Sequence, residues 1–438
     1  MFAINALEKT ALTLGFIPLT DCAPLIVAQE HGWFAKYGLE VTLSKETSWA
    51  NIRDKVALGI LDGAQMLAPM PLAMSLGLGP MHKPMVTALT FDLNGNAITV
   101  SNALYERMQR ADAAAMHERP LSARALKAVI EAERQAGRPP LTFAMVFPES
   151  THNYELRYWM AAAGIDPDND VRLVVVPPPQ MAGRLAQGEI DGYCVGEPWN
   201  AQAVQAGIGR TLITTYEIWN NSPEKVLGVT QEWAEQYPNT HHALLCALLE
   251  ACRWLDDPRH RVDAAALIAR SVHVNAPEHV VRMSMTGTFQ YAPDEMPRAL
   301  PDFNVFHRYA ANFPWRSHAI WFLTQMLRWG QLDHAIDLQA VACTVYRPDL
   351  YRAAAAHLGL PCPASDYKNE GRHEGSWKLY DGARSLPMGA DRFLDGRLFD
   401  PSQPLEYLQG FVVQHTKVSP AELAILNPAD GSRLQPSA

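Results

Sequence analysis

Residues 59–63 read Gly-Ile-Leu-Asp-Gly, and residues 188–192 read Gly-Glu-Ile-Asp-Gly. Each pentapeptide follows a segment with helical periodicity and precedes a short apolar run typical of a strand. A glycine that closes a helix and an Asp-Gly pair before a strand are residues that such turns favour. The two copies lie much further apart than the period of a solenoid repeat. The repetition therefore predicts two related α/β lobes.

The residues around each copy predict alternating strands and helices. We expect strands at 11–16, 39–43, 64–67, 141–146, 171–176 and 190–195. We expect helices at 20–38, 49–58, 151–163, 181–186, 237–274 and 314–330. Strands that alternate with helices are typical of parallel sheets covered by helices. The segment 361–389 is rich in Pro, Gly and charge and is expected to form a loop-like arm, and the last dozen residues are expected to fray.

The composition excludes several classes of protein. The chain has 438 residues, of which 48% are hydrophobic and 19% charged, so it can bury a core. Its net charge of −9 argues against direct binding to nucleic acid, which favours clustered Lys and Arg. No apolar run is long enough to span a membrane, so no membrane partner is predicted. The N-terminus lacks the pattern of a secretory signal, and six cysteines without a CxxC motif favour free thiols, so we expect a cytoplasmic protein.

The familiar catalytic motifs are missing from the sequence. It contains no GxGxxG, GxxxxGK[ST], GxSxG or HExxH segment. We interpret His373 and Glu374 as part of a solvated loop, the adjacent His241 and His242 as structural residues, and Cys22 as part of a packed turn. The sequence therefore predicts no catalytic residue, no metal site and no cofactor, and the protein is not expected to be an enzyme.

Polar residues at the ends of predicted strands suggest a ligand site instead. Open α/β sheets bind ligands beyond the carboxyl ends of their strands, and helix N-termini attract anions. An indole N–H, an amide, an imidazole, backbone N–H groups and one ammonium make a set of donors that suits an anion. The five candidates are Trp49, Asn96, His152, Gly196 and Lys225.

Several blocks of the sequence resemble the nitrate/bicarbonate-binding proteins of ABC importers. The most specific blocks are Pro177-Pro178-Pro179-Gln180-Met181 and Val195-Gly196-Glu197-Pro198-Trp199-Asn200. The others are 15–25, 32–38, 48–49, 61–64, 158–167, 223–225 and 399–401, and the resemblance extends from about residue 11 to about residue 417. It implies the type II periplasmic-binding-protein fold, in which two α/β lobes close over a ligand in the cleft between them. With this fold, we expect lobe I at 1–98, lobe II at 99–214, and the rest of lobe I with a helical and extended arm at 215–438.

The resemblance also implies a ligand for the five candidates. In that family, residues that match Trp49, His152, Gly196 and Lys225 hold nitrate, and a glutamine stands where this chain has Asn96. In the bicarbonate relatives a carboxylate that acts with calcium replaces the lysine, so Lys225 favours nitrate or nitrite. The shorter side chain of Asn96 leaves the preference between nitrate and nitrite open.

The absence of a recognisable secretory signal makes the chain most similar to the cytoplasmic NasS-type nitrate/nitrite sensors. These sensors hold a NasT-type RNA-binding antiterminator inactive until the anion binds, and so control nitrate assimilation. The alternative is the substrate-binding subunit of a nitrate ABC importer. Pyrimidine synthases of thiamine biosynthesis share the fold, but their cysteine-rich CCCFC stretch is absent here.

Overall fold

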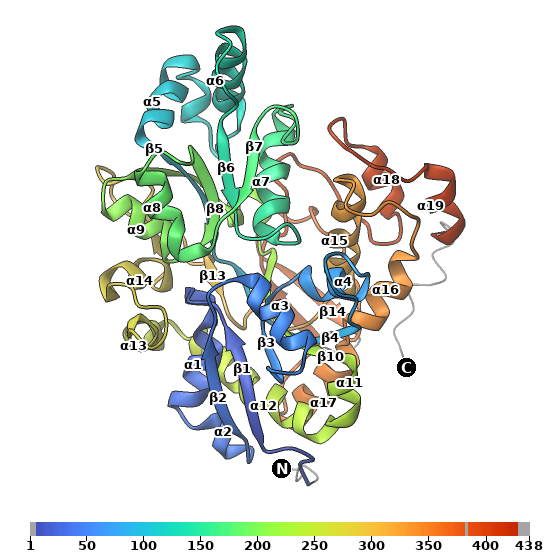
Figure 1. The fold of residues 1–438 in the computed structure, drawn as a ribbon. Coiled ribbons are helices and arrows are strands. Elements are labelled where there is room, and N and C mark those ends of the chain that lie inside the picture. Colours follow the sequence, from blue (N-terminus) through green and yellow to red (C-terminus); the bar gives the residue numbers. More distant parts are fainter. Residues whose placement is uncertain (1–5, 382–383, 428–438) are drawn as a thin grey trace.

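The computed structural model describes residues 6–381 and 384–427 and contains two α/β lobes, each built on its own sheet (Figure 1). Lobe II lies at the top of Figure 1, lobe I at the bottom, and the last helices lie along one side. None of the helices in the described part of the chain is long and apolar enough to cross a membrane. Of the last dozen residues, which were expected to fray, only Asn427 lies within the described part.

Lobe I contains a six-stranded sheet in the order β13-β4-β10-β3-β1-β2. β1 is parallel to β2 and β3, whereas β10 is antiparallel to both β3 and β4. The first part of the lobe comprises β1 (Ala11–Phe16), η1 (Thr20–Cys22), α1 (Ala23–Glu30), α2 (Trp33–Lys36), β2 (Glu40–Lys45), α3 (Trp49–Ala57), β3 (Gly63–Leu67), α4 (Met70–Ser75) and β4 (Met85–Asn94). The second part comprises β10 (Pro223–Thr230), α11 (Gln231–Gln236), α12 (Pro238–Leu255), η4 (Pro258–His260), α13 (Arg261–Ala269), α14 (Glu278–Met285), β11 (Thr288–Phe289), β12 (Arg298–Ala299) and β13 (Asn304–Val305).

Lobe II contains a five-stranded sheet in the order β7-β6-β8-β5-β9. β6 is parallel to β7 and β8, and β5 is antiparallel to β8 and β9. Its elements are β5 (Asn96–Ser101), α5 (Asn102–Ala111), η2 (Ala115–His117), α6 (Arg124–Gln135), β6 (Thr142–Met145), α7 (Thr151–Ala162), β7 (Arg172–Val175), η3 (Pro178–Gln180), α8 (Met181–Ala186), β8 (Gly192–Gly196), α9 (Trp199–Gln205) and β9 (Gly209–Thr214). The short helix α10 (Thr215–Ile218) leads back to lobe I.

The chain crosses from lobe I to lobe II at Gly95. This residue joins β4 to β5 with a φ of +93°, and a Cβ atom built on it would stand 2.8 Å from Nδ2 of Asn304. Only glycine suits such a position without strain. The crossing therefore precedes the expected boundary at residue 98, which lies inside β5. The chain returns through α10 and residues 219–222.

The repeated Gly-x-[Ile/Leu]-Asp-Gly segment forms the same turn in both lobes. Asp62 donates its backbone N–H to the carbonyl of Thr13 (2.9 Å) and accepts the N–H of Thr13 on Oδ2 (2.9 Å). Asp191 makes both bonds with Thr142, each at 2.8 Å. In each lobe the aspartate thus links the turn after a helix to the first parallel strand of the sheet. These bonds explain why both pentapeptides contain an aspartate at this position.

Two expected helices are interrupted in the structure. The range 237–274 contains α12, η4 and α13 instead of one helix. The single helix predicted over 20–38 is instead η1, α1 and α2, because the chain turns at Gly32 with a φ of +71°.

The C-terminal segment adds more structure than the predicted loop-like arm. It contains α15 (Arg316–Arg328), α16 (Leu338–Val345), α17 (Pro348–His357), β14 (Trp377–Asp381), β15 (Arg384–Met388), α18 (Pro404–Gln409) and α19 (Pro420–Leu426). β14 and β15 form a hairpin within the range expected to be a loop. The segment also reaches lobe II, since Tyr158 of α7 donates to the carboxylate of Asp395 at 2.9 Å.

Candidate functional site

The five predicted residues come from element ends in both lobes. Trp49 begins α3, whose N-cap is Ser48, and Lys225 lies in β10 of lobe I. The other three belong to lobe II: Asn96 begins β5, Gly196 ends β8, and His152 is in the first turn of α7. The four side chains are at most 1% exposed. Every candidate is therefore buried although each lies at the end of an element or near it.

A continuous series of contacts joins these residues. The Nζ atom of Lys225 lies 5.6 Å from the ring centroid of Trp49, 2.8 Å from Oδ2 of Asp21 and 2.5 Å from Oε1 of Glu224. On the lobe II side, Nδ1 of His152 lies 3.3 Å from the same oxygen of Glu224. The structure thus places the lysine, the indole and the imidazole around one pair of carboxylates.

Gly196 and Asn96 complete the group from the sheet of lobe II. The two residues face one another across β5 and β8. A Cβ atom built on Gly196 would lie 3.2 Å from Oδ1 of Asn96 and 3.5 Å from Oδ2 of Asp21. The absence of a side chain at Gly196 therefore lets the two lobes approach closely beside Lys225. All five predicted residues lie together, while their role in binding a ligand stays a prediction.

Several buried polar atoms of this group lack a hydrogen-bond partner among the described residues. They are Nε1 of Trp49, both amide atoms of Asn96 and both ring nitrogens of His152. A buried polar group without a partner costs about 1–3 kcal/mol, so such groups rarely gather without reason. The donor set fits a small anion with several oxygen acceptors.

The ammonium of Lys225 is the charge in the site that suits an anion, although the carboxylates of Asp21 and Glu224 share it. Burial opposes the charged form of Lys225, but attraction to Asp21, Glu224 and Asp92 outweighs it and raises the pKa of Lys225 above its ordinary value. Burial, and then the nearby Lys225, hold the pKa of His152 well below its ordinary value. The site therefore offers one fixed ammonium and a neutral imidazole that donates one N–H.

The five predicted residues do not include the two carboxylates that contact Lys225, Asp21 and Glu224. Asp21 accepts a hydrogen bond from Nε2 of Gln65, whose Oε1 accepts the N–H of Ile17 at 3.0 Å. Glu224 directly precedes Lys225 in β10, whereas Asp21 belongs to η1 and is distant in the sequence. The tertiary fold brings Asp21 to the lysine, and no local pattern in the sequence shows that contact.

Helix α7 also carries a buried acid that the sequence analysis missed, Glu155. The spacing from His152 to Glu155 is the one signal that could have found it, because residues three apart share a helix face.

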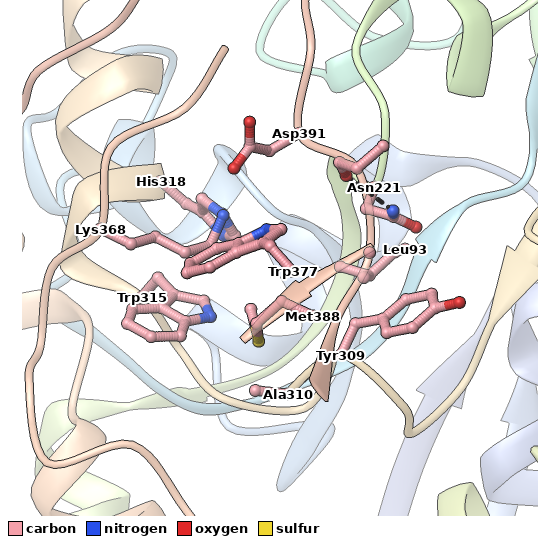
Figure 2. Close-up of a pocket in the computed structure, with 12 residues that line it drawn as sticks. Leu93, Asn221, Tyr309, Ala310, Trp315, His318, Lys368, Trp377, Met388 and Asp391 are labelled. Carbon is pink, nitrogen blue, oxygen red and sulfur yellow. Dashed lines mark hydrogen bonds between the residues drawn. The ribbon is translucent and has the colours of Figure 1, made fainter. Parts of the chain in front are cut away.

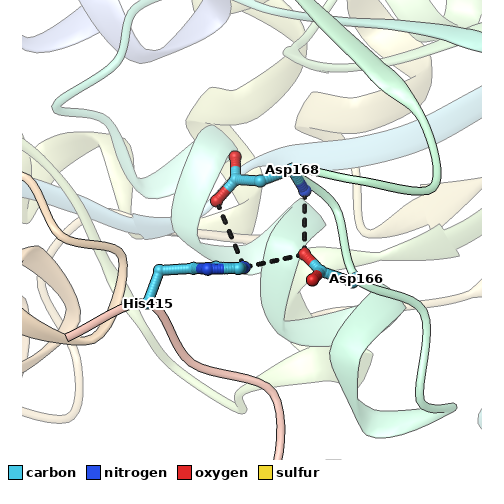
Figure 3. Close-up of side chains that lie close together, drawn as sticks. All are labelled: Asp166, Asp168 and His415. Atoms are coloured by element: carbon cyan, nitrogen blue, oxygen red, sulfur yellow. Dashed lines mark hydrogen bonds and ion pairs between the residues drawn. The ribbon is translucent and has the colours of Figure 1, made fainter.

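A separate group of possible metal ligands is explained by ion pairs. Among the described residues, Asp166, Asp168 and His415 lie close enough together to hold an ion (Figure 3). His415 contacts Asp166 at 2.8 Å, and Arg157 donates to both oxygens of Asp168 at 3.0 and 2.6 Å. These contacts already balance the charges, so the group is better described as a link between the C-terminal segment and lobe II.

A pocket of about 10 Å³ lies beside the C-terminal hairpin, and Figure 2 shows the residues that line it. None of the five predicted residues lines it. Its charged groups are paired, because His318 contacts Glu370 at 3.0 Å and Lys368 contacts the same carboxylate. The nearby His373 was expected in a solvated loop. It instead stacks on Trp377, with ring centroids 4.0 Å apart, and contacts Asp391 at 2.7 Å.

The remaining nucleophile and histidine candidates are structural. Burial raises the pKa of the Cys22 thiol well above its ordinary value, so the thiolate nucleophile is disfavoured. His241 is buried against Trp233, with ring centroids 5.6 Å apart.

Comparison with known proteins identifies the family. The profile of the NMT1-like family matches residues 5–269, more than half of the chain. The chain belongs to the NMT1-like family. The NMT1-like chain is 37% identical over 420 residues to the nitrate/nitrite binding protein NrtA of Synechococcus elongatus, a match that covers 93% of this chain and 87% of NrtA.

The crystal structure of the periplasmic nitrate-binding protein NrtA from Synechocystis superposes with a TM-score of 0.81 at 32% identity. This match covers 93% of the NMT1-like chain and all of the NrtA chain. The predicted periplasmic-binding-protein fold, with two α/β lobes, is thereby confirmed.

Other relatives are longer than this chain. The nitrate import ATP-binding protein NrtC of Synechocystis is 41% identical, and the bicarbonate transport ATP-binding protein CmpC of Synechococcus elongatus is 39% identical. The matches cover 96% and 97% of this chain but only 58% of each relative. These two relatives are named for ATP binding in nitrate import and in bicarbonate transport.

Proposed function

We propose that this protein binds nitrate or nitrite between its two lobes. The observation that carries the proposal is the gathering of unpartnered buried donors around Lys225. Lys225 supplies the positive charge, and Trp49, Asn96 and His152 donate to the oxygens of the anion. Gly196 leaves room for the ligand. The names of NrtA and its crystal structure support nitrate as the ligand.

We propose that the protein serves an ABC importer as its substrate-binding component. This role is supported by relatives that are named for nitrate binding or for nitrate and bicarbonate transport. In this reading, closure of the two lobes over the anion makes the form that an importer accepts.

The sensor role predicted from the sequence remains a second proposal. Its support is the combination of the site around Lys225 with an acidic net charge of −9, which suits a protein that acts on an RNA-binding partner and does not bind RNA itself. In this reading, the protein is cytoplasmic and releases a NasT-type antiterminator when nitrate or nitrite binds.

Thermal unfolding with sodium nitrate, sodium nitrite, and bicarbonate with calcium tests the ligand. A ligand at 100 times its Kd stabilises the fold by about 2.7 kcal/mol. We expect a rise in melting temperature with nitrate or nitrite, and none when Lys225 is replaced by Met. A response to bicarbonate with calcium alone would contradict the proposal.

Size-exclusion chromatography separates the two roles. The protein is mixed with a NasT-type antiterminator, with and without nitrate. The sensor role predicts a complex that nitrate dissociates. The importer role predicts no complex, and stimulation of importer ATPase activity by the nitrate-loaded protein.

A further inference from the structure

Glu155 is a buried acid on lobe II that has no partner for its charge. It follows His152 by one turn of α7 and so faces the same side of the helix. The residue is 1% exposed, and neither carboxyl oxygen has a hydrogen-bond partner among the residues that the structure describes. An ionised carboxylate in such surroundings is costly unless a cation pairs with it.

The face of α7 that carries Glu155 packs against the start of β10 in lobe I. The hydroxyl of Thr151 donates to the carbonyl of Pro223 at 3.5 Å, and Nδ1 of His152 lies 3.3 Å from Oε1 of Glu224. The titratable, charged and polar groups near Glu155 are Ser222, Glu224 and Lys225 before and on β10, Cys194 on β8, and His152 on its own helix. The one cation in this set is Lys225.

Lys225 cannot neutralise Glu155, because two other carboxylates already share it. Its Nζ atom contacts Asp21 at 2.8 Å and Glu224 at 2.5 Å. A bound anion adds another negative charge to this cluster. Burial, and then Glu224, raise the pKa of Glu155 well above its ordinary value, although Ser222 and Lys225 oppose the shift.

We propose that the anion binds together with one proton, which Glu155 carries while the two lobes are closed. This inference rests on the proposed binding of nitrate or nitrite. The proton comes from solvent, bonds to a carboxyl oxygen of Glu155 on closure, and returns to solvent on opening. Glu155 faces lobe I across the boundary between the lobes. Separation of the lobes therefore exposes its carboxyl group to water and returns its pKa towards the ordinary value.

Two other buried acids provide controls. Asp92 lies in β4 of lobe I, where its Oδ1 accepts the N–H of Lys225 at 3.2 Å, and burial raises its pKa well above the ordinary value. Its surroundings belong to lobe I alone, so we expect it to keep its proton in open and closed forms. Glu197, beside Gly196, has a pKa raised to about 7 by burial, and its Oε2 accepts the N–H of Ala201 at 3.1 Å.

The proposal predicts the direction of the pH dependence. Because the closed, anion-bound form holds the additional proton, affinity falls as pH rises. The fall is about tenfold per pH unit for one proton, between the pKa of Glu155 in the open form and its higher pKa in the closed form.

Isothermal titration calorimetry with sodium nitrate tests this at pH 6, 7 and 8. Each titration is repeated in phosphate and in Tris, buffers with very different ionisation enthalpies. For the wild type we expect a buffer-dependent enthalpy that corresponds to one proton taken up per nitrate. Glu155→Gln keeps the size of the side chain without a titratable group, so its enthalpy and affinity should not depend on buffer or pH. Asp92→Asn should take up a proton as the wild type does.

The outcomes separate this inference from the proposed function. Nitrate binding by the wild type with equal enthalpies in both buffers would overturn the proton uptake and leave the proposed function intact. Uptake that survives Glu155→Gln and disappears in Glu197→Gln would overturn the assignment to Glu155. No nitrate binding at any pH would overturn both proposals. Because the comparison of buffers uses the wild type, it decides whether a proton is taken up even if Glu155→Gln fails to fold. Loss of that uptake in Glu197→Gln or Asp92→Asn would then assign the proton to another acid, and its survival in both supports Glu155.

Discussion

At Lys225, one ammonium group is shared between two buried carboxylates from different elements. Asp21 comes from η1 and Glu224 from β10, and all three residues are at most 1% exposed. Breaking a buried ion pair by removing one partner costs about 3–5 kcal/mol, because a charge is left buried alone. The lysine therefore holds lobe I together as well as offering charge to a ligand.

Lys225→Met is expected to lose nitrate binding and also to lower the free energy of unfolding by about 3–5 kcal/mol. The carboxylate of Asp21, whose pKa burial already raises, then lacks a cation and is buried at lower cost when protonated. The destabilisation should therefore be larger at pH 8 than at pH 5. Urea unfolding followed by circular dichroism at both pH values measures it. Lys36→Met, which removes an exposed lysine paired with Glu250, is the control, and an equal loss at both pH values would contradict the prediction.

Gly196→Ala is expected to weaken nitrate binding by about tenfold, the equivalent of 1.4 kcal/mol. The added Cβ would lie 3.2 Å from both Oδ1 of Asn96 and Cδ2 of Leu19, a distance that forces these groups apart. Calorimetric titration gives the affinity. Gly183→Ala in α8 is the matched control, since a Cβ there has no atom within 4 Å. An unchanged affinity for Gly196→Ala would show that the ligand lies elsewhere.

At the scale of elements, the Asp-Gly turn before β3 and β8 fixes how each helix joins its sheet. Both aspartates bind the first parallel strand of their lobe through one donor and one acceptor. Their other contacts differ. Oδ1 of Asp62 also accepts the indole N–H of Trp233 at 2.9 Å and contacts Lys9 at 2.5 Å. The corresponding Oδ1 atom of Asp191 lies 3.5 Å from Nη2 of Arg107, which is a longer and weaker contact.

Asp62→Ala is therefore expected to destabilise the protein more than Asp191→Ala. A hydrogen bond to a charged group contributes about 1.5–3 kcal/mol, and Asp62 makes more of them. Chemical unfolding of the two single variants and the double variant measures the difference. The two losses should add, because the sites are far apart. An equal loss in both single variants would contradict the importance of the Trp233 contact.

At the scale of the whole molecule, the C-terminal segment packs against α7, the helix that carries His152 and Glu155. Besides the bond from Tyr158 to Asp395, the hydroxyl of Tyr154 donates to Gln331 at 2.7 Å. His415 contacts Asp166 just beyond the end of α7 (Figure 3). Helix α7 is thus held by residues that follow both lobes in the chain as well as by its contacts with β10.

His415→Ala is expected to lower the free energy of unfolding by about 0.5–1 kcal/mol at neutral pH, as for a partly exposed hydrogen bond. Burial acts to raise the pKa of Asp166, but the bond from His415 and other hydrogen bonds outweigh it and lower that pKa. A lowered pKa in the folded state gives stability above the ordinary pKa of aspartate, and this stability is lost as pH falls. The difference between wild type and variant should therefore shrink on acidification, which urea unfolding at pH 7 and pH 3 would show. If wild type and variant differ by the same free energy of unfolding at both pH values, the loss comes from packing and not from the contact with Asp166.

The sequence by itself determined the two lobes, most of their strands, and the five candidate residues at element ends. These features depend on local patterns: a repeated turn, alternating periodicities and residues that end strands. Only the tertiary structure decided that Asp21 and Glu155 lie near Lys225 of β10, since these acids come from η1 and α7. It also decided that the chain crosses lobes at Gly95 and that the predicted arm contains a hairpin. Burial and pairing of charges depend on contacts between distant segments, and a local sequence pattern does not contain that information.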